Sequence, residues 1–178
     1  MRKLILLFTI SLTLSSCSND DDNNAQNPID QLPPATQTGE NTFGCLLDSE
    51  VFIPGGGINP LDCVYQFVNG GYYFGLQGNK RDNDNNLITL SLSTNALEIN
   101  QGQTYALIND EIGNAYAGYL YVTLSSITSE NNTGELTITK LDTENQIVSG
   151  TFWFDVIHPV TGEIAEIREG RFDMQYTQ

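Results

Sequence analysis

The C-terminal part of the sequence carries the pattern that most restricts how this chain can fold. Between Ile147 and Ile157 apolar residues recur at every second position, which is the period of a β-strand with one buried face. A second apolar run covers residues 164–176, and the turn residues Pro159 and Gly162 lie between the two runs. The pattern predicts one long β-hairpin, and further strands must cover its apolar face.

The second arm of this predicted hairpin changes phase near its middle. Ala165 and Ile167 are apolar in one register, whereas Phe172 and Met174 are apolar in the opposite register. One extra residue near Glu169-Gly170 would return both pairs to the same face, which is the effect of a β-bulge. We therefore expect a bulge at this point of the strand.

The rest of the chain from residue 40 onward consists of short apolar runs, separated by turn residues at intervals of about eight to twelve positions. No segment keeps the 3.6-residue period of an amphipathic helix. We therefore expect a single all-β domain over residues 40–178, with about ten strands and meander connections. An antiparallel β-sandwich and a partly open barrel both fit, because strands alternate in the same way in both architectures.

The first residues have the features of a secretion signal. Arg2 and Lys3 precede an apolar stretch of eleven residues, which is too short to span a bilayer. The sequence Leu14-Ser15-Ser16-Cys17 resembles the lipobox of bacterial lipoproteins, in which the cysteine is lipidated and the preceding peptide is removed. The resemblance implies a signal peptide over residues 1–16 and a lipid anchor on Cys17. An ordinary secretory signal is the alternative.

The stretch that follows Cys17 is acidic and contains few apolar residues. Residues 20–22 are three consecutive aspartates, and this run resembles the surface-export signal of Bacteroidota lipoproteins, although a solvated tether would look the same. We expect residues 17–39 to form a disordered stalk, because the segment after the cysteine contains three prolines and no basic residue. The expected location is the outer membrane, with the domain exposed at the cell surface.

The charge of the chain excludes one class of partner. Seven basic and twenty-two acidic residues give a net charge of −15, and removal of Arg2 and Lys3 with the signal peptide would change it to −17. A surface with this charge repels nucleic acids and anionic lipid headgroups. We therefore expect no nucleic acid partner, and attachment to a membrane only through the lipid anchor.

Three short blocks of the domain resemble a family of Bacteroidota lipoproteins whose domain has no known function. The blocks are residues 43–48 (FGCLLD), 150–154 (GTFWF) and 169–173 (EGRFD). The resemblance covers most of residues 42–176, and the lipobox and stalk agree with it. It implies an all-β fold and the same cellular location, but it implies no activity and provides no functional residues.

Two cysteines, Cys45 and Cys63, remain once Cys17 is assigned to the lipid. An even pair in an oxidising compartment predicts a disulfide between the first predicted hairpin (residues 43–53) and the second (residues 63–76). Such a bond would contribute about 3 kcal/mol to stability. The alternative is two buried thiols that pack as small apolar residues.

No motif of the chain indicates catalysis, a metal site or a cofactor. Residues 82–86 begin like an EF-hand loop, but Leu87 replaces the required glycine, so a solvated hairpin tip fits better. His158 is the only histidine, which excludes the usual zinc ligand sets, and we expect it in an exposed turn. The glycines of residues 54–57 lack the lysine and the helix of a phosphate loop. We therefore expect a protein that is not an enzyme; a hydrolase, the less favoured alternative, would need converging carboxylates.

Aromatic side chains on outward faces are the one feature that suggests recognition. Trp153 has the polar phase of its strand, and the run 115–125 places Tyr119 and Tyr121 opposite its leucines and valine. Flat rings beside polar residues are typical of sugar- and protein-binding surfaces, although Tyr and Trp are also good strand formers. The sequence favours a binding or structural module with an unknown ligand. A glycan-binding module that uses these rings is the alternative.

Overall fold

The computed structural model describes residues 27–57 and 59–178, so the predicted signal peptide, Cys17 and the first part of the stalk lie outside the described residues. The described part is built almost entirely of β-strands, which confirms the predicted all-β class. None of its segments is a helix with the length and apolarity needed to cross a membrane. The elements are η1 (Pro28–Gln31), β1 (Thr42–Leu47), β2 (Glu50–Phe52), β3 (Leu61–Val68), β4 (Gly71–Arg81), β5 (Leu87–Thr94), β6 (Thr104–Leu107), β7 (Ala115–Tyr121), β8 (Leu124–Ile127), β9 (Gly134–Asp142), β10 (Ile147–Ile157) and β11 (Ile164–Gln175).

The eleven strands form one sheet in the order β2-β1-β11-β10-β9-β6-β7-β5-β4-β3, with β8 paired to β7. Consecutive strands are neighbours in β3-β4-β5 and in β9-β10-β11, as a meander predicts. The meander is interrupted where β1 pairs with β11 and where β6 lies between β9 and β7. The pairing of β6 with β7 is parallel, so the sheet is mixed, and it is not closed into a barrel.

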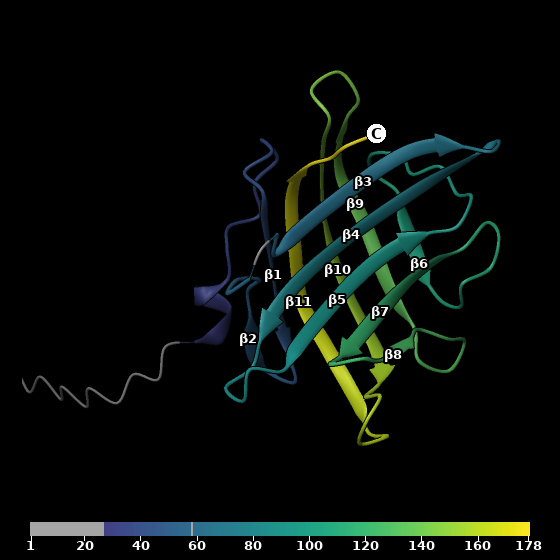
Figure 1. Ribbon diagram of the computed structural model, residues 1–178. Coiled ribbons are helices and arrows are strands. Elements are labelled where there is room, and N and C mark those ends of the chain that lie inside the picture. The colour runs from purple at the N-terminus through teal and green to yellow at the C-terminus, as the bar shows by residue number, and fades with distance from the viewer. Residues whose placement is uncertain (1–26, 58) are drawn as a thin grey trace, which may run out of the picture.

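The sheet bends so that its two halves enclose one core. In Figure 1, β3, β4 and β5 cross in front of β9, β10 and β11. Phe74 of β4 and Phe172 of β11 meet across this interior, with their ring centroids 6.2 Å apart. Thr177, just after β11, connects the halves through backbone hydrogen bonds with Cys63 and Tyr65 of β3, at 3.0 and 2.9 Å. This arrangement fits both the predicted sandwich and the predicted partly open barrel.

β10 and β11 form the predicted C-terminal hairpin, and the predicted β-bulge is present. The register shifts where Trp153 of β10 lies opposite two residues of β11, Arg168 and Glu169. Glu169 has a φ of 54°, in the left-handed region that single residues of bulges adopt. As a result, Ile167 and Gly170 are both buried although they are three positions apart.

The predicted outward position of Tyr119 is wrong. The run 115–125 is not one strand, because Val122 has a φ of 60° and the chain turns there into β8. Tyr119 is only 3 % exposed and lies in the core with Ala117, while Leu120 belongs to the opposite face. The inward residues before Tyr119 are alanines, so both phases of β7 have similar hydrophobicity and periodicity could not identify the buried one.

The predicted disulfide is absent, and Cys45 and Cys63 both have free thiols. Cys45 lies on β1 and Cys63 on β3, two strands that are not neighbours in the sheet. Both side chains are in the hydrophobic core, and burial raises the pKa of each thiol well above the ordinary value for cysteine. The two residues therefore pack as small apolar side chains.

Residues 32–40 lie along the outer face of β1 and β11, although the composition placed the chain up to residue 39 in a disordered stalk. We call this segment the strap. Leu32 is buried, and Pro33 packs directly on Gly44 of β1, where a Cβ would come within 2.5 Å of the proline Cδ. Side-chain packing and hydrogen bonds thus order the chain before the first strand begins.

The carboxylate of Asp173 on β11 holds the strap in place. The side chain is fully buried. The groups that donate hydrogen bonds to it are Thr36 Oγ1 (2.7 Å), Thr38 N (2.9 Å), Gly39 N (2.9 Å), Glu40 N (3.2 Å) and Ser149 Oγ (2.7 Å). Burial alone would raise the pKa of Asp173, but the hydrogen bonds from Ser149, Thr36 and the strap backbone outweigh it and lower the pKa to about 2.

Asp173 should therefore make the stability of the fold depend on pH in acid. Folding lowers the pKa of Asp173 from an ordinary value of 3.8 to about 2. The carboxylate therefore contributes fully to the free energy of unfolding when the pH is above the pKa of the unfolded chain. This contribution is lost as the pH falls through the pKa of the folded chain. The shift corresponds to about 2 kcal/mol. We expect the urea midpoint to fall between about pH 4 and pH 2, and Asp173→Asn to lack this component. An identical acid dependence in the variant would contradict the assignment.

Candidate functional site: a groove beside Trp153

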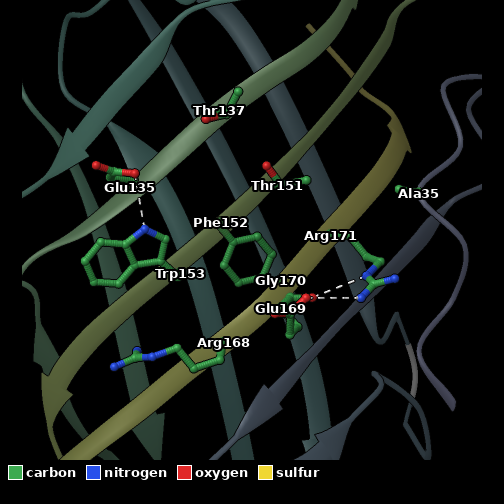
Figure 2. Close-up of a pocket in the computed structure, with 10 residues that line it drawn as sticks. All are labelled: Ala35, Glu135, Thr137, Thr151, Phe152, Trp153, Arg168, Glu169, Gly170 and Arg171. Carbon is green, nitrogen blue, oxygen red and sulfur yellow. Dashed lines mark hydrogen bonds and ion pairs between the residues drawn. The ribbon is translucent and has the colours of Figure 1, made fainter. Parts of the chain in front are cut away.

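A groove of about 520 Å³ lies on the outer face of β9, β10 and β11. The strap contributes one wall through Ala35. Figure 2 shows Trp153 and Arg168 toward one side of the groove and Arg171 and Ala35 toward the other. The lining residues are Ala35, Glu135, Thr137, Thr151, Phe152, Trp153, Arg168, Glu169, Gly170 and Arg171.

Strand alternation brings the polar and aromatic side chains of the groove to one face. Thr151 and Trp153 are successive outward positions of β10, and they pair with Thr137 and Glu135 of β9. On the other side, the bulge of β11 presents two consecutive residues in place of one. The result is a strip of hydroxyl, indole and charged groups across three neighbouring strands.

The indole of Trp153 is fixed at its edge and remains partly exposed. Its Nε1–H donates a hydrogen bond to Glu135 Oε2 at 3.2 Å. The Arg168 guanidinium carbon lies 5.5 Å from the ring centroid, within the range of a cation–π contact. The side chain is nevertheless 36 % exposed, and Figure 2 shows it lying along the sheet between Glu135 and Arg168. A ligand in the groove would therefore meet an oriented aromatic surface.

The cationic side chains of the groove are already paired within the protein. Arg168 Nη2 lies 3.1 Å from Glu166 Oε1 and 2.7 Å from Asp155 Oδ1, the latter an ion pair outside hydrogen-bond geometry. Arg168 Nη1 also donates to two backbone oxygens. Arg171 Nη2 lies 3.8 Å from Glu169 Oε2. These contacts reduce the capacity of both arginines to bind an anionic ligand.

The groove provides surfaces for stacking and hydrogen bonding. The indole can pack against the apolar face of a ring, while the hydroxyls of Thr137 and Thr151 and the carboxylate of Glu135 can bind polar groups at its edge. Among the described residues, no group of three or more His, Cys, Asp or Glu side chains is placed to hold a metal ion.

One family model covers most of the folded domain. Residues 65–174 match the family described as Domain of unknown function (DUF6252). The chain belongs to this family. No curated protein and no solved structure matches the chain. The DUF6252 match extends from β3 into β11, so it includes every groove residue except Ala35 of the strap.

Within the DUF6252 domain, the three aromatic residues predicted to bind a ligand do not form one patch. Trp153 lies in the groove, whereas Tyr119 is buried, and burial raises its pKa to about 12. Tyr121 is half-buried and donates a hydrogen bond to Asp82 at 3.1 Å. The ring centroids of Tyr119 and Tyr121 lie 5.2 and 5.4 Å from that of His158, which packs on them instead of standing free in its turn. Of the three residues, Trp153 is the one that lines the groove.

In the DUF6252 domain, the loop of residues 82–86, which begins like a calcium-binding loop, is held by hydrogen bonds of its own. Asp82 Oδ1 accepts hydrogen bonds from the backbone N–H groups of Asp84 and Asn86, at 3.0 and 2.8 Å. Burial opposes ionisation of Asp82, but the hydrogen bonds from Asn86 and Tyr121 outweigh it and lower the pKa of the carboxyl group. The aspartate thus closes the hairpin tip through its own side chain.

Sequence reasoning missed the charged residues of the DUF6252 groove, Glu135, Arg168 and Arg171. Part of the signal was available, because the predicted bulge at Glu169-Gly170 implies two consecutive outward side chains beside Trp153. The register of β9 against β10 was not available, because alternation assigns faces to residues but does not say which residues lie opposite each other.

Proposed function

We propose that this protein is a lipid-anchored lipoprotein at the cell surface of a Bacteroidota species, and that its DUF6252 domain binds a glycan without catalysing a reaction. The observation that carries the proposal is the Trp153 groove, in which Glu135 orients a partly exposed indole beside the Thr137 and Thr151 hydroxyls. Such a combination suits a sugar ring, which has an apolar face and a hydroxyl-bearing edge. The location rests on the signal segment and on the lipobox that ends at Cys17.

The charges of the groove favour an uncharged sugar. Arg168 and Arg171 are engaged by carboxylates of the protein, and the chain as a whole has a net charge of −15. An acidic glycan would have to displace an ion pair and approach against this field. We therefore infer that the ligand is a neutral oligosaccharide.

The anchor can be tested by intact mass and by protease treatment of whole cells. We expect a mass increase at Cys17 that corresponds to three acyl chains, and removal of the domain by protease added outside the cell. A Cys17→Ser variant should lose both the lipid mass and the membrane attachment. An unmodified chain that is protected from external protease would contradict the anchor and the surface location.

Glycan binding can be tested with a panel of neutral hexasaccharides, namely those of xylose, glucose (β-1,4 and β-1,3) and mannose. We expect at least one to bind, and Trp153→Ala to weaken binding by about tenfold to thirtyfold, because the substitution removes the stacking surface. Isothermal titration calorimetry would give the dissociation constants.

The matched control for Trp153→Ala is Tyr73→Ala, which removes an outward aromatic side chain from β4, away from the groove. This control should bind like the unsubstituted chain, and Trp153→Phe should retain part of the affinity. If Trp153→Ala binds as well as the control, or if no glycan of the panel binds, the proposal fails. A structural role in the envelope would then be the better interpretation.

A further inference from the structure

Part of the outer edge of β3 has no strand beside it. On its inner side β3 pairs with β4 along its whole length. On the outer side, Tyr65 N–H donates to Thr177 O and Thr177 N–H donates to Cys63 O. Because backbone groups alternate in direction along a strand, the C=O of Tyr65 and both backbone groups of Phe67 point to the same side. Within residues 27–57 and 59–178, these three groups have no hydrogen-bond partner.

An aromatic cavity of about 540 Å³ lies beside these unpaired groups. The ring of Tyr72 lies 5.5 Å from that of Tyr65 and 4.9 Å from that of Phe67, between centroids. Phe67 lies on the same face of β3 as the buried residues Cys63 and Tyr65. Its side chain is nevertheless 61 % exposed, because the core does not extend as far as this end of the strand. The lining residues are Tyr65, Gln66, Phe67, Tyr72, Thr143, Tyr176 and Gln178. The cavity therefore presents apolar surface that no described residue covers.

The surroundings of this cavity are acidic. Asp142 is the last residue of β9 and Glu144 lies in the turn after it, on either side of Thr143, which lines the cavity. Burial, together with the nearby charge of Glu98, raises the pKa of Tyr65 to about 12. Lys140 of β9 is paired with Asp142 at 3.6 Å, and no basic residue is among those that line the cavity. The net negative charge favours an occupant with lysine or arginine side chains.

We propose that the β3 edge binds an extended peptide of a partner protein, which adds as a strand beside Tyr65 and Phe67. One aromatic or branched aliphatic side chain of the peptide enters the aromatic cavity. Basic residues on either side of it face Asp142, Glu144 and Glu98. This mode of recognition takes its affinity from main-chain hydrogen bonds and its specificity from the pocket for alternate side chains. The site is separate from the Trp153 groove and does not depend on glycan binding.

An extended polypeptide explains the three unpaired backbone groups, which a sugar does not. They alternate along the strand with the spacing of a β-ladder, and only another backbone supplies donors and acceptors at that spacing. The edge also continues the single parallel bridge between Val64 and Thr177, so a partner backbone is already accepted beside β3. A second copy of this chain, with its own acidic β3 region, would meet like charges there.

The test starts from a phage-displayed library of random dodecapeptides, selected on the immobilised full-length chain in detergent. We expect enriched peptides that combine β-branched or aromatic residues with lysine or arginine. Their affinity should fall about tenfold in Phe67→Ala, which removes the ring, and about tenfold further in Phe67→Pro, which also removes the outward N–H. Proline is tolerated at such an edge position, so the ladder with β4 should stay intact.

Tyr116→Ala is the control, because it removes an outward aromatic side chain from β7, three strands away from β3. It should bind the selected peptides like the unsubstituted chain, and their binding should weaken as salt is raised. Equal affinities for Phe67→Ala and Phe67→Pro would overturn strand addition. So would a library without enrichment, or a stable dimer in light scattering that Phe67→Pro dissociates, because a second copy would then occupy the edge.

Discussion

Replacement of Asp173 by alanine should lower the free energy of unfolding by about 3 kcal/mol and release the strap from β11. Five donors would lose their acceptor together, and those from Gly39 and Ser149 belong to buried residues. A buried donor without a partner costs about 1 to 3 kcal/mol, which a mobile strap can reduce by exposing its amides to water. Urea denaturation would measure the loss, and amide hydrogen exchange would report the release of residues 36–40.

Asp173→Asn is the matched control, since it keeps the size of the side chain and one acceptor oxygen but removes the charge. It should lose less stability than Asp173→Ala. Because Ala35 of the strap forms a wall of the Trp153 groove, release of the strap should also weaken glycan binding. Strap amides that stay protected from exchange in Asp173→Ala would contradict the role given to this carboxylate.

The second large effect is expected at Phe152, where replacement by alanine should cost about 4 kcal/mol. The centroid of its ring lies 5.2 Å from that of Phe43 and 6.4 Å from that of Phe172. The ring also lies over Gly170, where a Cβ would come within 2.5 Å of it. Phe152 therefore fills the space left by the glycine and joins three strands, β1, β10 and β11. Urea or thermal denaturation would measure the effect.

The neighbouring residue provides the control for this substitution. Trp153→Ala changes the next position of β10 on the opposite, outer face, and it should cost less than about 1 kcal/mol. The comparison separates the two faces of one strand, since the inward ring supports the fold and the outward ring lines the proposed ligand site. Similar losses of stability in both variants would contradict the assignment of Trp153 to a ligand site.

The parts of the fold that follow from local patterns could be predicted from the sequence. The phase change between Ile167 and Phe172 was sufficient to locate the bulge, because only an extra residue returns both to the core. An Asn-Gly pair such as Asn69-Gly70 likewise favours a tight hairpin turn, and both residues have the positive φ that such a turn requires. In each case the physical cause lies within a few consecutive residues.

The parts that depend on contacts between distant segments could not be predicted in this way. The strap looked like a disordered stalk because its composition is polar, and its order comes from Asp173, more than 130 positions further along the chain. The disulfide required that Cys45 and Cys63 lie on adjacent backbone, and the sheet order separates their strands. Tyr119 was assigned to the wrong face because its neighbouring alanines gave no clear phase.

The chain contains one tryptophan, so one signal reports directly on the proposed ligand site. The indole N–H resonance of Trp153 can be followed by nuclear magnetic resonance while a hexasaccharide that binds the full-length chain is added. If the groove is the ligand site, this resonance should shift in a saturable manner, with the dissociation constant found by calorimetry. An indole resonance that stays unchanged while the sugar binds would show that the ligand occupies another part of the molecule.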